Sequence, residues 1–340
     1  MRIKITYLFT LLLICTSGHS HTIEDSQIFS IVSASDTISF FKVNSDTITP
    51  KPTVLFCQGS LPIPLFIEDS ETVFIPSLGN FDYPALSNQY NFVVISMPHT
   101  PIYSNNTHLN NSFAYVPDTI FPTNYDSLYL KDNYLEKYVE RGNKVIQFLK
   151  TQKWVDPNKI ILMGHSQGAN VGLKIASQNP DIFALGYFSG SVGGRFAKYI
   201  REERKKAKLD LQTKEETQSN INQLYTEWKK ICRDSMDYGD PSHTWKSFSI
   251  SFLQEMIHLK MPVYVTYGTE DSGTEDCDYL PIYFELSKKT NYAIRAFVGL
   301  GHNFEEVLPD GKSNYDNMYW DQAVKEFFNW IEKQPYVSVQ

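Results

Sequence analysis

The sequence predicts an α/β fold in which a mostly parallel central sheet is flanked by helices. Three observations lead to this prediction. Short apolar runs recur along the chain, and most are apolar throughout, as in strands buried on both faces of a parallel sheet. Segments with helical periodicity separate these runs, as crossovers between parallel strands require. The one long stretch without a strand candidate, residues 193–260, has a helical pattern.

Residues 27–32 and 37–43 are rich in β-formers and flank a short polar stretch, which predicts an antiparallel hairpin. Six buried-type strands are then expected at Thr53 to Cys57, Phe92 to Ser96, Lys159 to Met163, Ala184 to Ser189, Val263 to Tyr267 and Ala293 to Val298. Helices are expected at Tyr134 to Lys150, Gln167 to Ser177, Tyr279 to Lys289 and Trp320 to Lys333. Residues 26–192 and 261–340 are therefore predicted to form one core, interrupted by a helical insertion at 193–260.

The overall composition excludes several classes of protein. A hydrophobic fraction of 42% in 340 residues is enough for a sizeable core. The net charge of −7 argues against a general nucleic-acid binder, which needs a basic face. Four cysteines without a C-x-x-C pair indicate neither a disulfide-dense scaffold nor a zinc site. We therefore expect a globular protein without a metal or an organic cofactor.

The first twenty residues have the pattern of a secretory signal peptide. Arg2 and Lys4 precede an apolar run over residues 5–14, and small residues near Gly18 suit cleavage. The run is shorter than the roughly 20 residues that span a bilayer. A buried N-terminal strand or helix is the alternative. Because the run ends in Cys15, a lipoprotein signal with a lipid tether also stays open, although Ile14 is not the small residue expected there. The protein is expected to be exported.

Export would permit disulfide bonds. Cys57 ends an apolar strand and is expected to be a buried small hydrophobe. Cys232 and Cys277 could pair, but the sequence does not establish the geometry that a disulfide needs.

The clearest chemical motif follows the predicted strand at residues 159–163. Gly164-His165-Ser166-Gln167-Gly168 is a G-x-S-x-G sequence between a strand and a helix. A serine on such a sharp turn projects above the sheet, and the two glycines let the strand and helix approach closely. The Gln167 N–H then lies at the start of the helix, where it can stabilise an oxyanion. Ser166 is therefore the predicted nucleophile.

From Thr53 to the C-terminal helix, the chain resembles the α/β-hydrolase superfamily. The resemblance implies that an acid and a histidine follow the serine in that order. Gly268-Thr269-Glu270-Asp271 follows the strand at residues 263–267, and Asp271 matches the position of the acid. Glu270, Glu275, Asp276 and Asp278 are alternatives in the same loop. His302 lies on the loop after the last predicted strand, where the superfamily has its general base.

The chemistry of these side chains suits the implied roles. An imidazole has an unperturbed pKa near ~6.5, so His302 can accept and return a proton near neutral pH. Asp271 would hold the imidazole in one tautomer and stabilise its charged form. In this superfamily the second oxyanion donor comes from the loop after the first core strand. Here that loop is Gln58 to Leu61, so Ser60 or Leu61 would donate, and we favour Ser60.

Two further histidines are candidates for substrate binding, together with Leu61. His165 lies inside the nucleophile motif, where packing or capping is more common than reaction. His99 follows the strand at residues 92–96, at the edge of the sheet where open α/β folds bind ligands. A plain surface position is the alternative for His99, and we favour it.

The inserted segment at 193–260 begins with a basic run that contains Arg195, Lys198 and Arg201. A solvated helix face explains such a run more simply than an anion-binding surface does. The resemblance implies a cap or lid at this place in the chain, which would shape the substrate pocket.

The sequence as a whole predicts an exported serine hydrolase that cleaves a carboxylic ester through an acyl-enzyme. A peptidase, an amidase or an acyltransferase on the same fold is the alternative. A non-catalytic binding protein is a further alternative, because fold alone does not determine function. The expected partner is a small-molecule acyl substrate, and neither nucleic acid nor any defined oligomer is indicated.

Overall fold

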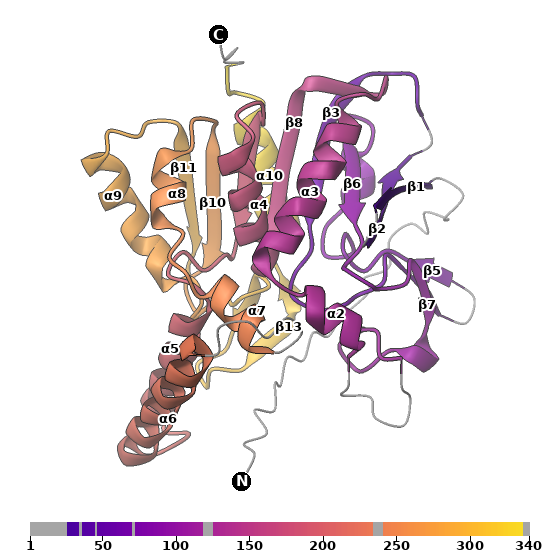
Figure 1. The fold of residues 1–340 in the computed structure, drawn as a ribbon. Helices are drawn as coiled ribbons and strands as arrows, with labels where there is room; N and C mark the ends of the chain where they lie inside the picture. Colours follow the sequence, from indigo (N-terminus) through magenta and orange to yellow (C-terminus); the bar gives the residue numbers. More distant parts are fainter. Residues whose placement is uncertain are drawn as a thin grey trace.

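The structure is a computed structural model, and it describes residues 26–33, 36–44, 46–69, 72–117, 125–233 and 241–335 (Figure 1). The predicted leader at residues 1–20, with Cys15, lies outside these ranges. Within them, no helix combines the length and apolar character that a bilayer span requires.

An eight-stranded sheet forms the centre of the protein, in the order β1-β2-β6-β3-β8-β9-β10-β11. Its strands are β1 Ser26–Ser33, β2 Asp36–Val43, β3 Lys51–Cys57, β6 Asn91–Ile95, β8 Val155–His165, β9 Ala184–Phe188, β10 Val263–Gly268 and β11 Tyr292–Phe297. The first two strands form an antiparallel hairpin, and β2 pairs with β6 in the same way. All other neighbours are parallel. The predicted hairpin and six strands are confirmed, and five of the six are largely buried. The sixth, β11, is the edge of the sheet and is mostly half-buried, so its prediction as a buried strand is wrong.

The apolar strands are explained by a core on each face of the sheet. In β8, Ile160 and Leu162 belong to one buried cluster, while Ile161 and Met163 belong to the other. The first cluster lies under α3 (Leu135–Leu149) and α4 (Gln167–Gln178), and the second under α10 (Trp320–Ile331). Because successive side chains point to opposite faces, a strand between two cores must be apolar throughout. Figure 1 shows α3 and α4 in front of the sheet and α10 behind it.

Several short elements were not predicted. A small sheet of β4 (Phe66–Asp69), β5 (Thr72–Phe74) and β7 (Tyr103–Asn105) packs beside the main one. A hairpin of β12 (Glu305–Val307) and β13 (Ser313–Met318) separates His302 from α10. The unpredicted short helices are α1 Tyr83–Leu86 and α2 Ser127–Asp132, whereas α9 Leu280–Leu286 lies within the helix predicted at Tyr279 to Lys289.

The strand order locates the place where a ligand is expected. From β3 the chain first adds β6 on one side and then β8 on the other. The connections after β3 and β8 therefore lead to opposite sides, and open α/β sheets bind ligands at the carboxyl ends of the strands at such a point. Cys57, at the end of β3, lies opposite Gly164 of β8. Both lead directly into the predicted site.

Residues 193–260, here called the cap segment, lie between β9 and β10, and their described parts, 193–233 and 241–260, form four α-helices. They are α5 Arg195–Lys208, α6 Lys214–Arg233, α7 Pro241–Phe248 and α8 Leu253–His258. The pair α5–α6 projects away from the body in Figure 1. The later part packs more deeply, because Phe248, Phe252 and Met256 belong to the buried cluster beneath α3 and α4. The helical character predicted for the segment is confirmed.

Candidate active site

Ser166 lies on a sharp turn between β8 and α4. Its backbone has φ 58° and ψ −124°, a conformation that L residues rarely adopt. The flanking glycines are sterically required: a Cβ on Gly164 would lie 2.2 Å from the Gly168 carbonyl oxygen, and one on Gly168 would lie 2.0 Å from that of Cys57. The turn is held by a hydrogen bond from the Ser166 N–H to the Phe188 carbonyl, 2.9 Å long. The strained turn thus presents the serine above the sheet.

Three side chains from separate loops form a hydrogen-bonded relay. His302 Nε2 lies 2.9 Å from Ser166 Oγ, and His302 Nδ1 lies 2.5 Å from Asp271 Oδ2. A carboxylate only accepts hydrogen bonds, so the neutral ring carries its proton on Nδ1 and leaves Nε2 to accept from the Ser166 hydroxyl. In this arrangement His302 Nε2 can take the proton from the Ser166 hydroxyl and later give it to a leaving group.

Asp271 is buried, with a side chain only 3% exposed. Burial opposes its ionisation, but the neighbouring His302 and a 2.8 Å hydrogen bond from the Gly273 N–H outweigh that effect and lower the pKa of Asp271 to about 2. Asp271 is therefore charged at neutral pH, as the relay requires.

The other acidic residues of this loop have different partners. Glu270 lies 3.3 Å from Lys205, while Arg201 contacts both Glu275 and Asp276. Asp278 accepts a hydrogen bond from the Tyr267 hydroxyl. The structure therefore brings Asp271, and none of these four, to His302.

His165 points toward the base loop. Its Nε2 lies 2.9 Å from the His302 carbonyl oxygen, and its ring packs against Trp320 at a centroid distance of 4.9 Å. Burial and the nearby His302 lower the pKa of His165 to about 3, so this ring is neutral and donates from Nε2. The contact joins the nucleophile turn to the loop of His302. A direct role of His165 in substrate binding stays a prediction.

The proposed oxyanion donors lie on the nucleophile turn itself and on the loop after β3. Gln167 is the first residue of α4 and directly follows the serine. The loop after β3 approaches the same turn, since Gly168 packs against the Cys57 and Gln58 carbonyls. The Tyr129 hydroxyl donates to the Ser60 carbonyl, 2.9 Å away, and so fixes the peptide that joins Ser60 to Leu61. Tyr129 belonged to an aromatic stretch without a specific motif, and no sequence signal marked its contact with Ser60.

His99 lies apart from the relay. Its φ is 51°, and its Nε2 is 2.9 Å from Asp132 Oδ2 at the end of α2. Lys137 lies 3.3 Å from the same Asp132 oxygen. His99 is thus fixed at the end of β6 within a charged cluster, and no contact joins it to Ser166 in the described part of the chain.

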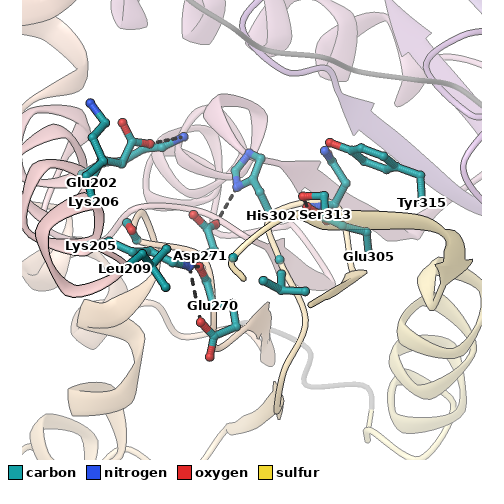
Figure 2. A pocket seen from close by; sticks show the side chains of 16 residues that line it. Glu202, Lys205, Lys206, Leu209, Glu270, Asp271, His302, Glu305, Ser313 and Tyr315 are labelled. Atoms are coloured by element: carbon teal, nitrogen blue, oxygen red, sulfur yellow. Dashed lines mark hydrogen bonds and ion pairs between the residues drawn. The ribbon is translucent and has the colours of Figure 1, made fainter. Parts of the chain in front are cut away.

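A cavity of about 330 Å³ opens beside the relay (Figure 2). His302 and Asp271 form part of its wall, with Lys198 and Lys205 of α5 on one side and Tyr315 of β13 on the other. Figure 2 shows His302 between α5 and the β12–β13 hairpin. The cavity lies on the base side of Ser166, and its lining carries charges of both signs.

Sequence reasoning did not identify Glu305, which holds the base loop in place. The residue is 4% exposed. Its Oε2 accepts from the Asn303 N–H at 2.7 Å, its Oε1 accepts from the Ser313 hydroxyl at 2.8 Å, and its carbonyl accepts from the Gly301 N–H at 2.7 Å. Both residues that flank His302 are therefore tied to Glu305. A glutamate three positions after a histidine carries no specific motif.

The described residues contain no cluster of three or more His, Cys, Asp or Glu side chains that could hold a metal ion. Cys232 is exposed and Cys277 is buried, and both are free thiols in the structure. The relay has all the groups that acyl transfer by a serine needs.

Comparison with solved structures shows the fold. The chain superposes with a TM-score of 0.53 on the 2,6-dihydroxy-pseudo-oxynicotine hydrolase, at 13% identity over 90% of this chain and 67% of that one. For the Pyrococcus horikoshii acylaminoacyl peptidase the TM-score is 0.53 and the identity 14%, over 93% of this chain. A dienelactone hydrolase-like promiscuous phosphotriesterase from metagenomic libraries matches with a TM-score of 0.50 and 11% identity, over 91% of this chain and 98% of that one.

These likenesses confirm the α/β-hydrolase fold, and at such identities they show the fold alone. The chain spans only 42% of the length of the Pyrococcus peptidase. No curated protein sequence matches the chain.

The family assignment comes from the sequence itself. The model of the prolyl oligopeptidase family matches residues 130–333, which is more than half of the chain and includes Ser166, Asp271 and His302. Together with the fold, this match confirms the expectation of a serine hydrolase. The chain belongs to the prolyl oligopeptidase family.

Proposed function

We propose that the protein is an exported hydrolase that cleaves a carboxylic ester through an acyl-enzyme on Ser166. The observation that carries the proposal is the relay from Ser166 through His302 to the buried Asp271, with contacts of 2.9 and 2.5 Å. The strained turn at Ser166 supports it, because such strain persists only where the surrounding structure maintains it.

In the first half-reaction, Ser166 Oγ attacks the ester carbonyl carbon while its proton passes to His302 Nε2. The carbonyl oxygen becomes an oxyanion, which accepts hydrogen bonds from the Gln167 N–H and from an N–H of the Ser60–Leu61 loop. The carbon–oxygen bond to the alcohol then breaks, and the alcohol leaves with the proton from His302. Throughout, the Asp271 carboxylate stabilises the charged imidazole.

In the second half-reaction, water replaces the alcohol. His302 takes a proton from the water as the water oxygen attacks the acyl carbon, and the bond to Ser166 Oγ breaks as the proton returns to that oxygen. An acyltransferase would use a second alcohol in place of water, with the same side chains.

The leaving group must lie near His302, since this residue protonates it. The cavity of about 330 Å³ lies on that side, between α5 and β13. Its lining includes Lys198, Glu202 and Tyr315, which suits a polar leaving group better than an alkyl chain. In this proposal the cap segment shapes the leaving-group site.

Cleavage of a peptide bond is the second candidate function. The family match at residues 130–333 favours it, because the family is described by its oligopeptidase activity. The chemistry is the same except that His302 protonates an amine.

The test combines covalent labelling with two substrate panels. We expect a fluorophosphonate to label the wild type, and Ser166→Ala to lose both labelling and turnover, since loss of a triad nucleophile costs roughly 10⁶-fold in the subtilisin precedent. Ser177→Ala is the matched control, because Ser177 is an exposed serine later on α4. Absence of Ser166-dependent labelling would contradict the proposal. Faster turnover of aminoacyl arylamides than of 4-nitrophenyl esters would instead identify a peptidase.

Export is a separate part of the proposal and depends on residues 1–20 alone. N-terminal sequencing of protein recovered outside the cytoplasm is expected to begin near residue 19 or 21. A mature chain that begins at Cys15 and carries lipid would indicate the tethered form instead.

A further inference from the structure

The side chain of Gln167 connects the nucleophile turn to the cap segment. The carboxamide is buried, and the residue is 6% exposed. Its Oε1 accepts a hydrogen bond from the guanidinium of Arg195, the first residue of α5. Arg195 therefore contacts the side chain of Gln167, the residue whose backbone N–H is the proposed oxyanion donor.

Arg195 has no carboxylate partner in the part of the chain that the structure describes. It contacts the neutral carboxamide of Gln167 and the ring of Phe248, whose centroid is 4.8 Å from Cζ. Other cationic side chains of the cap segment differ from it. Ion pairs with carboxylates are formed by Lys198, Arg201, Lys205, Lys206 and Lys230. Arg195 is half-buried, and its hydrogen bond goes to a neutral amide. The other N–H groups of its guanidinium can therefore still donate to an anion.

A second donor lies beside Arg195. Gln167 Nε2 is buried near the Tyr138 phenol, but no hydrogen bond of ordinary geometry satisfies it among the described residues. Buried polar atoms are normally hydrogen-bonded, and exceptions often mark a place that a ligand or water completes. The Arg195 guanidinium and the Gln167 amide thus form adjacent N–H donors, which is the arrangement that binds a planar carboxylate.

The position of these donors indicates which half of the substrate they meet. Arg195 lies over the ring of Phe248, and that ring lies 6.1 Å from the ring of Tyr138, so Arg195 is close to this phenol. The positive charge of Arg195 partly opposes the rise that burial causes in the pKa of Tyr129 and Tyr138. Tyr129 in turn holds the Ser60 carbonyl. Arg195 is therefore on the oxyanion side of Ser166, whereas the leaving group lies on the His302 side. The acyl group is the part of the substrate that reaches Arg195.

We propose that Arg195 and Gln167 form an acyl-group subsite that selects substrates whose acyl group carries a carboxylate, such as the monoester of a dicarboxylic acid or an acidic amino-acid residue. This inference rests on the proposed function. It concerns a different part of the substrate from the cavity beside His302.

The test compares two esters that differ only at the far end of the acyl chain. Mono-(4-nitrophenyl) adipate ends in a carboxylate, where 4-nitrophenyl hexanoate ends in a methyl group. We expect the wild type to have a higher kcat/KM for the adipate. Arg195→Gln is expected to lower the adipate-to-hexanoate ratio at least about tenfold, as for loss of one charge-assisted contact. Arg195→Lys keeps the charge without the planar fork and should give an intermediate ratio.

Arg204→Gln is the matched control, because it removes the same charge from an exposed position on α5. It should leave the ratio at the wild-type value. If Arg195 only fastened the cap segment to α4, both specificity constants would fall together and the ratio would not change, which would overturn the inference.

A measurement on the wild type alone covers the case in which Arg195→Gln does not fold. Adipate should slow fluorophosphonate labelling of Ser166 more than hexanoate does, and equal protection would count against the subsite. Failure of the proposed function looks different, because Ser166 would then not be labelled at all. Labelling and ester turnover without a preference for the adipate would refute the subsite and leave the hydrolase intact.

Discussion

The core around Ser166 and the α5–α6 part of the cap segment differ in how their polar groups are held. In the core, Asp271 and Glu305 are almost fully buried, and each accepts hydrogen bonds in a fixed arrangement. In α6, only Thr217 and Ile221 are buried, and ion pairs such as Lys230 with Glu227 face solvent. A buried polar group depends on its partners, whereas an exposed ion pair contributes about 0–1 kcal/mol. Substitutions in the core should therefore change catalysis, and substitutions in the cap segment should change selection.

The acid provides the most severe test of the core. Asp271→Asn should lower kcat about 10⁴-fold, because an amide favours the wrong imidazole tautomer. Glu270→Gln and Asp276→Asn are matched controls in the same loop, and both carboxylates pair with cap cations instead of His302. Steady-state kinetics of the three variants would check this. A severe loss in Asp276→Asn would show that the acid is misassigned.

Glu305 tests whether the core acts through exact placement of its base. Glu305→Ala leaves the Asn303 N–H without an acceptor and frees the loop of His302, so kcat should fall by about 10²-fold, as for a misplacement near 1 Å. The kcat of Glu305→Gln should fall less, since its amide oxygen can still accept. Glu306→Ala, on the same strand, removes a carboxylate that contacts Asn314 and Asn317, and it serves as the control. Equal rates for both alanine variants would contradict a positioning role for Glu305.

The pH dependence of stability should separate the buried core from the solvated cap segment. The pKa of His165 is lowered to about 3 in the folded protein, whereas it is near ~6.5 in the unfolded chain. As the pH falls below ~6.5, His165 therefore takes up a proton in the unfolded chain but not in the folded protein. The stability that the neutral ring supplies is complete above that value and is lost as the pH falls toward 3. At pH 5 the loss should be about 2 kcal/mol.

Urea unfolding at pH 7.5 and pH 5 would measure this effect. His165→Gln can still donate to the His302 carbonyl but does not titrate, so its stability should change less between the two pH values. The same acid sensitivity in both proteins would mean that His165 is not held neutral.

A deletion in the cap segment should have the smallest effect on the reactivity of Ser166, but it should change which substrates are preferred. We expect replacement of residues 198–231 by a short Gly/Ser linker to change the ratio of kcat/KM for an acetyl and a bulky ester by about tenfold, since the α5 wall of the cavity is lost. Labelling of Ser166 by a small fluorophosphonate should persist. An unchanged ratio in a folded variant would show that the segment is not a lid.

The two regions were also unequally predictable from the sequence. The strand ending at Met163, the glycines beside Ser166 and the loops holding Asp271 and His302 follow local rules of periodicity and sterics, so the sequence predicts both the elements and their order. Glu305 acts through a local contact, two positions away, that matches no known motif. Arg195 and Tyr129 act through contacts with residues 28 and 69 positions away, without a repeating pattern. Such contacts depend on how loops meet across the sheet, which a single sequence does not specify.

The contact between His165 and His302 has a consequence for how the protein matures. The two residues are 137 positions apart, yet the hydrogen bond between them joins the turn of the nucleophile to the loop of the base. Ser166, Asp271 and His302 follow β8, β10 and β11, so their contacts need all three strands in the sheet. We therefore expect Ser166 to become reactive only when the sheet is complete. Fluorophosphonate labelling during refolding would then report the arrival of the native state, later than any measure of helix content.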